Sequence, residues 1–306
     1  MGISQYIKEI GRGPRGSKPL TREQAADLFG QLLDGNVTDL EIGAFCLAMR
    51  IKGETPEEMC GFLDAAHSRM ALFPASDRPV IVLPSYNGAR KLPVLTPLLA
   101  LLLAREGLPV LLHGMRTEAR RTLASDVLLA LGVPALTAPE KIATGSVAHI
   151  ETGYLHAALA RLLKVREVVG LRNAGHSIVK LMNPCAGPAV VVTSYTHPEY
   201  YEMLQATFGA LHMTALLSRG LEGEVATDPR RTPRYDAFVA GVHQLLQEQQ
   251  PGTAADVPGL PTEIDIDTTA RYTQDVLDGR LPVPPALAQQ VEHLLPLAAQ
   301  TPPHAP

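Results

Sequence analysis

The 306-residue sequence predicts an α/β protein with a small all-α N-terminal domain and a mostly parallel central sheet flanked by helices. Apolar residues at helical spacing fill the first 70 positions, and no strand-like run interrupts them. From position 79 onward, short continuous apolar runs alternate with helical stretches, which is typical of parallel strands covered on both faces. At roughly 150 residues per domain the length suits two domains, and we place them at residues 1–75 and 76–306.

Helix-capping residues divide the N-terminal domain. Thr21 precedes an apolar helical pattern that stops at Gly35. A second helix is expected from Thr38 or Asp39. A third is expected after Thr55, where a proline suits the first helical turn.

The second domain is expected to alternate strands and helices. The predicted strands cover residues 80–83, 109–112, 147–150, 189–194 and 211–217. The predicted helices cover 98–105, 122–131, 154–164 and 197–207, followed by helices near 235–248, at 268–279 and at 284–298. Because ligands of α/β sheets bind at the carboxyl ends of strands, we expect function in the loops 84–93, 113–122, 151–156, 172–185 and 218–231.

The composition excludes several classes of protein. With 46% apolar and 19% charged residues the chain is not disordered, and 5% aromatic residues without Trp disfavour modules that stack nucleic-acid bases. The three cysteines are far apart, so neither a disulfide framework nor a thiolate zinc site is expected. No signal sequence and no apolar run long enough to span a bilayer is found, and we expect a cytoplasmic protein without a membrane partner.

Charge is distributed unevenly along the chain. The net charge is −4, but residues 1–190 hold 21 Lys and Arg against 17 Asp and Glu, and residues 191–306 hold 6 against 14. A positive face on the first part would contact nucleic-acid phosphates without reading bases. The cations assigned to this face are Arg12, Arg15, Lys18, Arg90, Lys91, Arg116, Arg120, Arg121, Arg172 and Lys180. Arg116 and Arg120 would share a face if their loop were helical. Alternatively, these cations balance neighbouring acids or bind a phosphorylated metabolite.

Histidines and carboxylates in the same loops are weaker candidates. His113, His156 and His176 lack any Ser/His/Asp or metal-ligand spacing, so we treat them as structural or ligand-contacting and assign no catalytic residue. Glu222 and Glu224 would offer two carboxylates to magnesium, but an acidic surface turn is the favoured interpretation. The sequence therefore predicts neither a resident metal nor a cofactor.

The element order and these loops resemble the family of anthranilate phosphoribosyltransferases and class II nucleoside phosphorylases over nearly the whole chain. The family's GTGGDG…NxST loop corresponds to Leu83 through Thr96, where Asn87 replaces the Asp and Gly88 and Thr96 match. Its KHGNR loop corresponds to LHGMR at 112–116, and its magnesium-binding Asp-Glu pair falls on Glu222 and a glycine.

This resemblance implies a vestigial substrate pocket made of Asn87, Gly88, His113, Gly114, Arg166 and His176. Arg166 matches the family arginine that faces anthranilate. Because most phosphate-loop positions and the acidic pair are altered, phosphoribosyl transfer with Mg²⁺ and an altered substrate is kept only as the alternative function.

Four motifs are more specifically similar to the YbiB-type DNA-binding paralogues of this family: KEIGRGPRGSKPLT, PSYNGARK, GLRNAGHSIVKLMNP and RGLEGE…DPRR. This similarity implies a homodimer that binds DNA or RNA independently of sequence, rather than an enzyme. Family members pair through the helical domain, and we expect its apolar residues Leu28, Leu32, Phe45, Met49 and Phe62 to form the pairing face. A third hypothesis is a phosphate-binding or regulatory protein without turnover.

Overall fold

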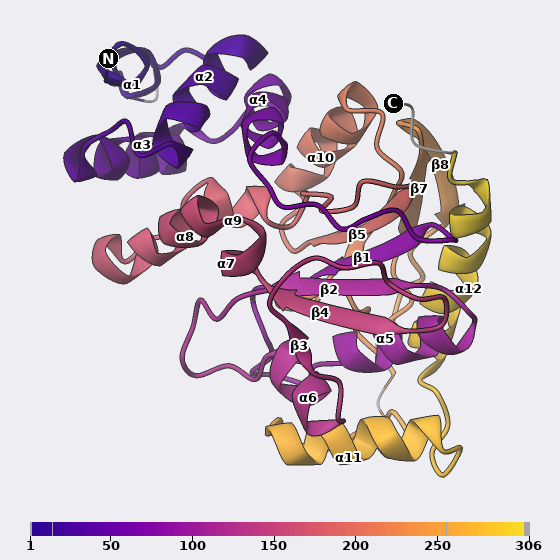
Figure 1. Ribbon diagram of the computed structural model, residues 1–306. Helices are drawn as coiled ribbons and strands as arrows, with labels where there is room; N and C mark the ends of the chain where they lie inside the picture. The colour runs from indigo at the N-terminus through magenta and orange to yellow at the C-terminus, as the bar shows by residue number, and fades with distance from the viewer. Residues whose placement is uncertain (1, 14, 255, 303–306) are drawn as a thin grey trace.

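The computed structural model describes residues 2–13, 15–254 and 256–302 (Figure 1). Its helical part begins with α1 (Ser4–Ile10), α2 (Arg22–Leu33), α3 (Asp39–Lys52) and α4 (Pro56–His67). A capping box opens α2, α3 and α4, in which Thr21, Thr38 and Thr55 accept a hydrogen bond from the backbone three residues on and the side chain there bonds back. The three predicted helices are confirmed, and α1 adds a fourth.

An eight-stranded sheet forms the centre of the α/β part. Its strands are β1 (Val80–Pro84), β2 (Val110–Gly114), β3 (Ala135–Leu136), β4 (Val147–Glu151), β5 (Ala189–Tyr195), β6 (Ala215–Arg219), β7 (Tyr235–Val239) and β8 (Val242–Gln247). They lie in the order β3-β4-β2-β1-β5-β6-β7-β8. The first six are parallel, and β7 and β8 are antiparallel to their neighbours. The predicted fold class is confirmed.

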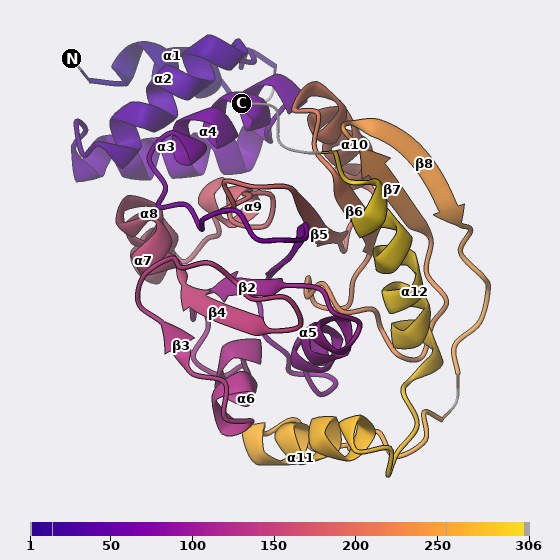
Figure 2. The same ribbon diagram turned by 45° about the vertical axis from the view of Figure 1, so that its right-hand side comes forward.

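Helices cover both faces of this sheet (Figure 2). Along β1, Ile81 and Leu83 belong to a core shared with α5 (Thr96–Arg105) and α12 (Pro285–Gln300). Val80 and Val82 belong to the opposite core, shared with the helical part and α10 (Glu199–Ala210). On the α5 side lie α6 (Ala124–Ala130) and α11 (Ile266–Leu277). None of the helices in the described ranges combines the length and apolar character that crossing a bilayer requires.

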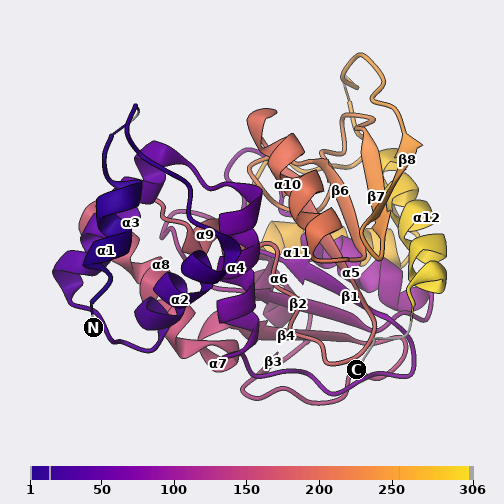
Figure 3. The same ribbon diagram turned by 90° about the horizontal axis from the view of Figure 1, so that it is seen from above.

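Three helices from the middle of the chain join the helical part: α7 (Thr152–Leu155), α8 (Ala157–Val169) and α9 (Gly175–Ile178). Their buried residues share one core with α2, α3 and α4, and Figure 3 shows α8 and α9 beside these helices. The helical part is therefore built from two stretches of sequence. The domain boundary at residue 75 stays a prediction.

The predicted helix near 235–248 is wrong, because the structure has the hairpin β7–β8 there. The two strands are joined by Ala240 and Gly241, whose φ angles of 46° and 82° suit a two-residue hairpin turn. β8 lies at the edge of the sheet and its first four residues are exposed. The stretch therefore lacks the apolar pattern of a buried strand.

The expected pairing face is also wrong, because its residues form the core of the helical part. Leu28, Phe45, Met49 and Phe62 are fully buried and Leu32 is 7% exposed. The ring of Phe62 packs on two other phenylalanines of this core. The large apolar side chains that α3 does expose are Leu40, Leu47 and Ile51.

Candidate functional site

Loops from the carboxyl ends of four adjacent parallel strands meet at one edge of the sheet. They follow β2, β1, β5 and β6, which are neighbours in that order. In Figure 1 the arrowheads of β2 and β4 point toward α7, so this edge faces the helices from the middle of the chain. Most of the candidate residues after position 80 lie in these loops.

The carboxylate of Glu224 fills the loop after β1. Its Oε1 accepts hydrogen bonds from the backbone N–H groups of Asn87 and Gly88, at 3.2 and 2.8 Å. Its Oε2 accepts from the hydroxyls of Ser85 and Thr96, at 2.7 and 2.9 Å. Converging backbone N–H groups next to the start of a helix, here α5, form a typical anion site. In this chain the anion is one of its own side chains.

Glu222 engages the next part of the same loop. Its Oε2 accepts from the backbone N–H groups of Arg90 and Lys91, both at 3.0 Å, and its Oε1 lies 3.2 Å from Nε of Arg90. Between the two acids, Gly223 has a φ of 82°, and a Cβ there would lie 2.1 Å from Nδ2 of the Asn87 side chain. This left-handed backbone conformation favours glycine. Both acids bond the loop and are nearly buried, so the interpretation of these acids as a surface turn is wrong.

Tyr86 occupies the space beside His113. Its hydroxyl lies 2.7 Å from Nδ1 of His113 and accepts a hydrogen bond from the Thr152 hydroxyl at 3.0 Å. All three side chains are buried. Burial lowers the pKa of His113 to about 3, so the imidazole is neutral at physiological pH.

Glu118, in the loop after β2, forms ion pairs with three arginines. Its carboxylate lies 3.0 Å from Arg166, 3.0 Å from Arg172 and 3.3 Å from Arg121. Burial disfavours the charged carboxylate, but these arginines together lower the pKa of Glu118. The arginine expected to face a substrate, Arg166, is thus held by Glu118 and donates to the Thr117 carbonyl at 3.2 Å.

The chain itself therefore fills most of the predicted substrate pocket. Gly114 leaves no room either, because a Cβ there would lie 1.8 Å from the Ser85 carbonyl oxygen. The oxygens of Glu222 and Glu224 already accept N–H and O–H groups, and no group of three or more metal-ligating side chains occurs within the described ranges. These residues do not fit a magnesium–diphosphate group, which needs free carboxylate oxygens and vacant N–H groups.

A basic cleft of about 750 Å³ opens beside the filled loop. Its lining includes the acids Glu222 and Asp228 and the cations Arg90, Lys91, Arg121, Arg219, Arg230 and Arg231. Asp228 pairs with Arg230 at 2.9 Å and with Arg231 at 3.6 Å. Lys91 and Arg219 form no ion pair with any residue that the structure describes. The basic cleft therefore keeps an excess of positive charge.

The structure gathers only part of the predicted positive face in the basic cleft, namely Arg90, Lys91 and Arg121. Arg172 and Lys180 line a separate cavity. Arg12, Arg15 and Lys18 lie in the segment between α1 and α2, which contributes nothing to the cleft lining, and Arg12 pairs with Glu9 at 2.8 Å.

Arg116 and Arg120 do not share a helical face, because the condition for it is not met and their loop is irregular. Arg116 is paired with Asp126 instead. The cations that the sequence interpretation missed are Arg219, Arg230 and Arg231. Their signal was the clustering of basic residues within the loop 218–231, whose motif RGLEGE…DPRR contributed to the resemblance but whose arginines were not assigned to the positive face.

Comparisons with known proteins agree with this fold. Residues 4–70 match the glycosyl transferase family, helical bundle domain. The chain is 37% identical over 298 residues to YbiB of Escherichia coli K12, covering 95% of this chain and 92% of that protein. It is 28% identical over 292 residues to the anthranilate phosphoribosyltransferase of Persephonella marina, covering 91% and 83%. The crystal structure of anthranilate phosphoribosyltransferase from Thermus thermophilus superposes with a TM-score of 0.75 at 20% identity, covering 98% of this chain and 90% of that one. The chain therefore belongs to the family of YbiB, whose fold is that of the anthranilate phosphoribosyltransferases.

Proposed function

We propose that this protein binds nucleic acid through the basic cleft, by contacts to phosphates that do not depend on base sequence, and that it needs no metal or cofactor to do so. The observation that carries the proposal is the lining of the cleft, with six cations against two acids. Arginine and lysine side chains that outnumber acids in an open groove favour a polyanion.

The polar character of the basic cleft supports backbone contacts rather than base stacking. Within the described residues its lining includes no Phe, Tyr or Trp. Its lining cations also lie on no helix, because they come from the last residue of β6 and from the loops after β1, β2 and β6. Without stacking platforms or a reading helix, affinity would come from phosphates alone.

A second candidate function is phosphoribosyl transfer, and the names of the relatives favour it. The site geometry opposes it, since the N–H groups of Asn87 and Gly88 already bond Glu224. To bind there, a diphosphate would have to displace the buried Glu224 carboxylate, which accepts hydrogen bonds from four donors. Release of diphosphate from phosphoribosyl pyrophosphate, in the presence of anthranilate and Mg²⁺, distinguishes the two functions.

We also propose that the protein is a homodimer that pairs through α3. Leu40, Leu47 and Ile51 lie at helical spacing on one side of α3 and are 83%, 47% and 59% exposed. An exposed apolar stripe of this kind is typical of a protein interface. A two-fold dimer would present the basic cleft twice to one nucleic acid.

The nucleic-acid proposal is tested by fluorescence anisotropy with labelled oligonucleotides of two unrelated sequences. The test variant K91A/R219A removes two cations that have no ion pair, so little folding damage is expected. The matched control K141A/R280A removes two exposed cations outside the cleft. We expect the affinity of the test variant for both oligonucleotides to fall equally, by about tenfold or more, and the control to bind them like the wild type. Equal binding by both variants would overturn the proposal.

A further inference from the structure

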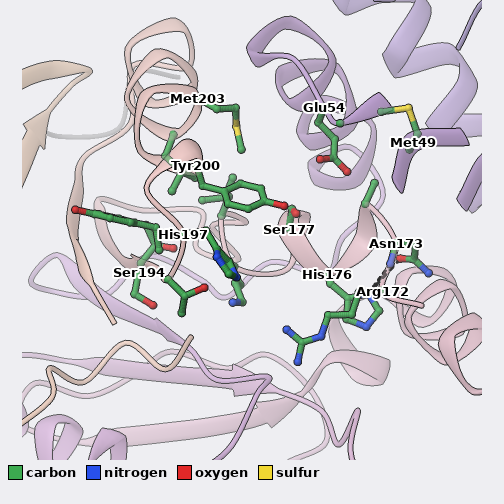
Figure 4. A pocket seen from close by; sticks show the side chains of 18 of the residues that line it. Met49, Glu54, Arg172, Asn173, His176, Ser177, Ser194, His197, Tyr200 and Met203 are labelled. Atoms are coloured by element: carbon green, nitrogen blue, oxygen red, sulfur yellow. Dashed lines mark hydrogen bonds between the residues drawn. The ribbon is translucent and has the colours of Figure 1, made fainter. Parts of the chain in front are cut away.

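A second cavity, of about 260 Å³, lies between the helical part and the sheet (Figure 4). Its walls come from the turn between α3 and α4, from α9 and the residues around it, and from β5 with the start of α10. Of the residues expected in the vestigial substrate pocket, only His176 lines it. The cavity adjoins the loop that Glu224 fills, because its lining residue Ser194 donates to the Glu224 carbonyl at 2.9 Å.

His176 leaves one ring nitrogen without a partner at this cavity. The residue is 8% exposed, and its Nε2 is buried and has no hydrogen bond within the described part of the chain. Its Nδ1 lies 3.3 Å from the backbone N–H of Asn173, which can only donate. The same Nδ1 lies 3.3 Å from Oδ1 of Asn173, which can only accept, so these contacts fit either tautomer of the ring. In the tautomer in which Nδ1 accepts, Nε2 carries the proton, and an N–H donor without a partner remains at the cavity.

Two cations stand close to this donor. The Lys180 ammonium has no hydrogen-bond acceptor among the described residues, whereas one edge of the Arg172 guanidinium binds Glu118 at 3.0 Å. Burial, and then the charge of Arg172, lower the pKa of Lys180 to about 8, although the nearby carboxylate of Glu224 acts in the opposite direction. Two neighbouring cations that destabilise each other are stabilised by an anion between them.

The remaining walls offer apolar contacts and one acid. Met49, Met203 and Leu204 line the cavity, and Figure 4 shows Met203 and Tyr200 across from Arg172. Glu54 is the one carboxylate among the described lining residues, and burial raises its pKa, which reduces its repulsion of an anion. The cavity thus has one wall of hydrogen-bond donors and an apolar region.

We propose that this cavity is a binding site for a small phosphate monoester that carries an apolar group. His176 Nε2, the Lys180 ammonium and the free N–H groups of Arg172 would donate to the phosphate oxygens, and the methionines would contact the apolar group. A phosphate offers three acceptor oxygens to these separate donors, whereas a carboxylate offers two. The proposal is independent of nucleic-acid binding in the basic cleft.

Isothermal titration calorimetry with phenyl phosphate tests this inference on the full-length protein. We expect a Kd on the order of 0.1–1 mM, as suits a ligand of this size. K180M keeps the apolar stem and removes the ammonium, and H176F removes the N–H donor. Each is expected to weaken binding about tenfold or more. K164M, which changes an exposed lysine of α8, is the matched control and should bind like the wild type.

Three outcomes would overturn the inference. One is the absence of phenyl phosphate binding to the wild type. The second is binding by K180M and H176F that equals the wild type, or benzoate binding as tightly as phenyl phosphate. The third is loss of binding in K91A/R219A with retention in K180M, which would place the phosphate in the basic cleft. Because K180M and H176F act on separate donors, a folding defect in one, visible by circular dichroism, still leaves the other as a test.

Discussion

Replacing Glu224 by alanine should destabilise the protein far more than its position in a loop suggests. The substitution removes the acceptor for two hydroxyls and for the N–H groups of Asn87 and Gly88. The hydroxyls can rotate to other acceptors, but the two backbone donors are fixed. At about 1–3 kcal/mol for each buried donor left unpaired, the loss in free energy of unfolding is roughly 2–6 kcal/mol. For a chain of this size that corresponds to a fall in Tm on the order of 10 °C.

Differential scanning calorimetry measures this change, with Glu248→Ala as the control. Glu248 is 71% exposed and lies 3.4 Å from Arg234, so its loss should cost less than about 1 kcal/mol. Inorganic diphosphate should raise the Tm of E224A more than that of the wild type, because only the variant has vacant N–H donors in this loop. If E224A unfolds at the temperature of E248A, Glu224 does not hold the loop and the reasoning is refuted.

Three further predictions concern acid stability, catalysis and assembly. Burial lowers the pKa of His113, His156 and His176 to about 3, 4 and 3, whereas the unfolded value is about 6.5. At a pH between the folded and the unfolded pKa of each histidine, the unfolded chain therefore binds more protons than the folded chain. The free energy of unfolding, measured in urea, should thus fall as the pH drops from 7 toward 5, by up to about 1.4 kcal/mol per unit for each histidine, and a constant value would contradict this. Diphosphate release from phosphoribosyl pyrophosphate with anthranilate should be undetectable, and steady turnover that Glu222→Ala abolishes would disprove the loss of catalysis. Light scattering should give twice the chain mass for the wild type and the single-chain mass for L47E, and a monomeric wild type would exclude pairing through α3.

The fold was largely predictable because burial leaves a periodic pattern in the sequence. Val80 through Leu83 form a continuous apolar run because both faces of β1 are covered. Thr21, Thr38 and Thr55 indicate where helices begin, because each caps its helix through local hydrogen bonds. The hairpin β7–β8 escaped prediction for the opposite reason. Its edge strand is exposed, and its turn uses Ala240 and Gly241 rather than the Asn-Gly or Asp-Gly pairs that mark such turns.

The site was less predictable because its contacts join distant parts of the chain. Glu224 bonds Ser85 across 139 positions, and no local pattern distinguishes a carboxylate that enters a loop from one that faces water. The same holds for Phe45 and Phe62, whose apolar character cannot tell a core from a pairing face. Residue type thus indicated which loops matter, whereas the partner of each side chain required the structure.

The salt dependence of DNA binding tests the role of the basic cleft most directly. With six cations against two acids, about four phosphates would be neutralised in each cleft. For each cleft that engages duplex DNA, the logarithm of the binding constant should then fall against the logarithm of salt concentration with a slope of about −4, and K91A/R219A should flatten this slope by about 2. A slope near zero for the wild type, or an unchanged slope in K91A/R219A, would contradict nucleic-acid binding by the cleft.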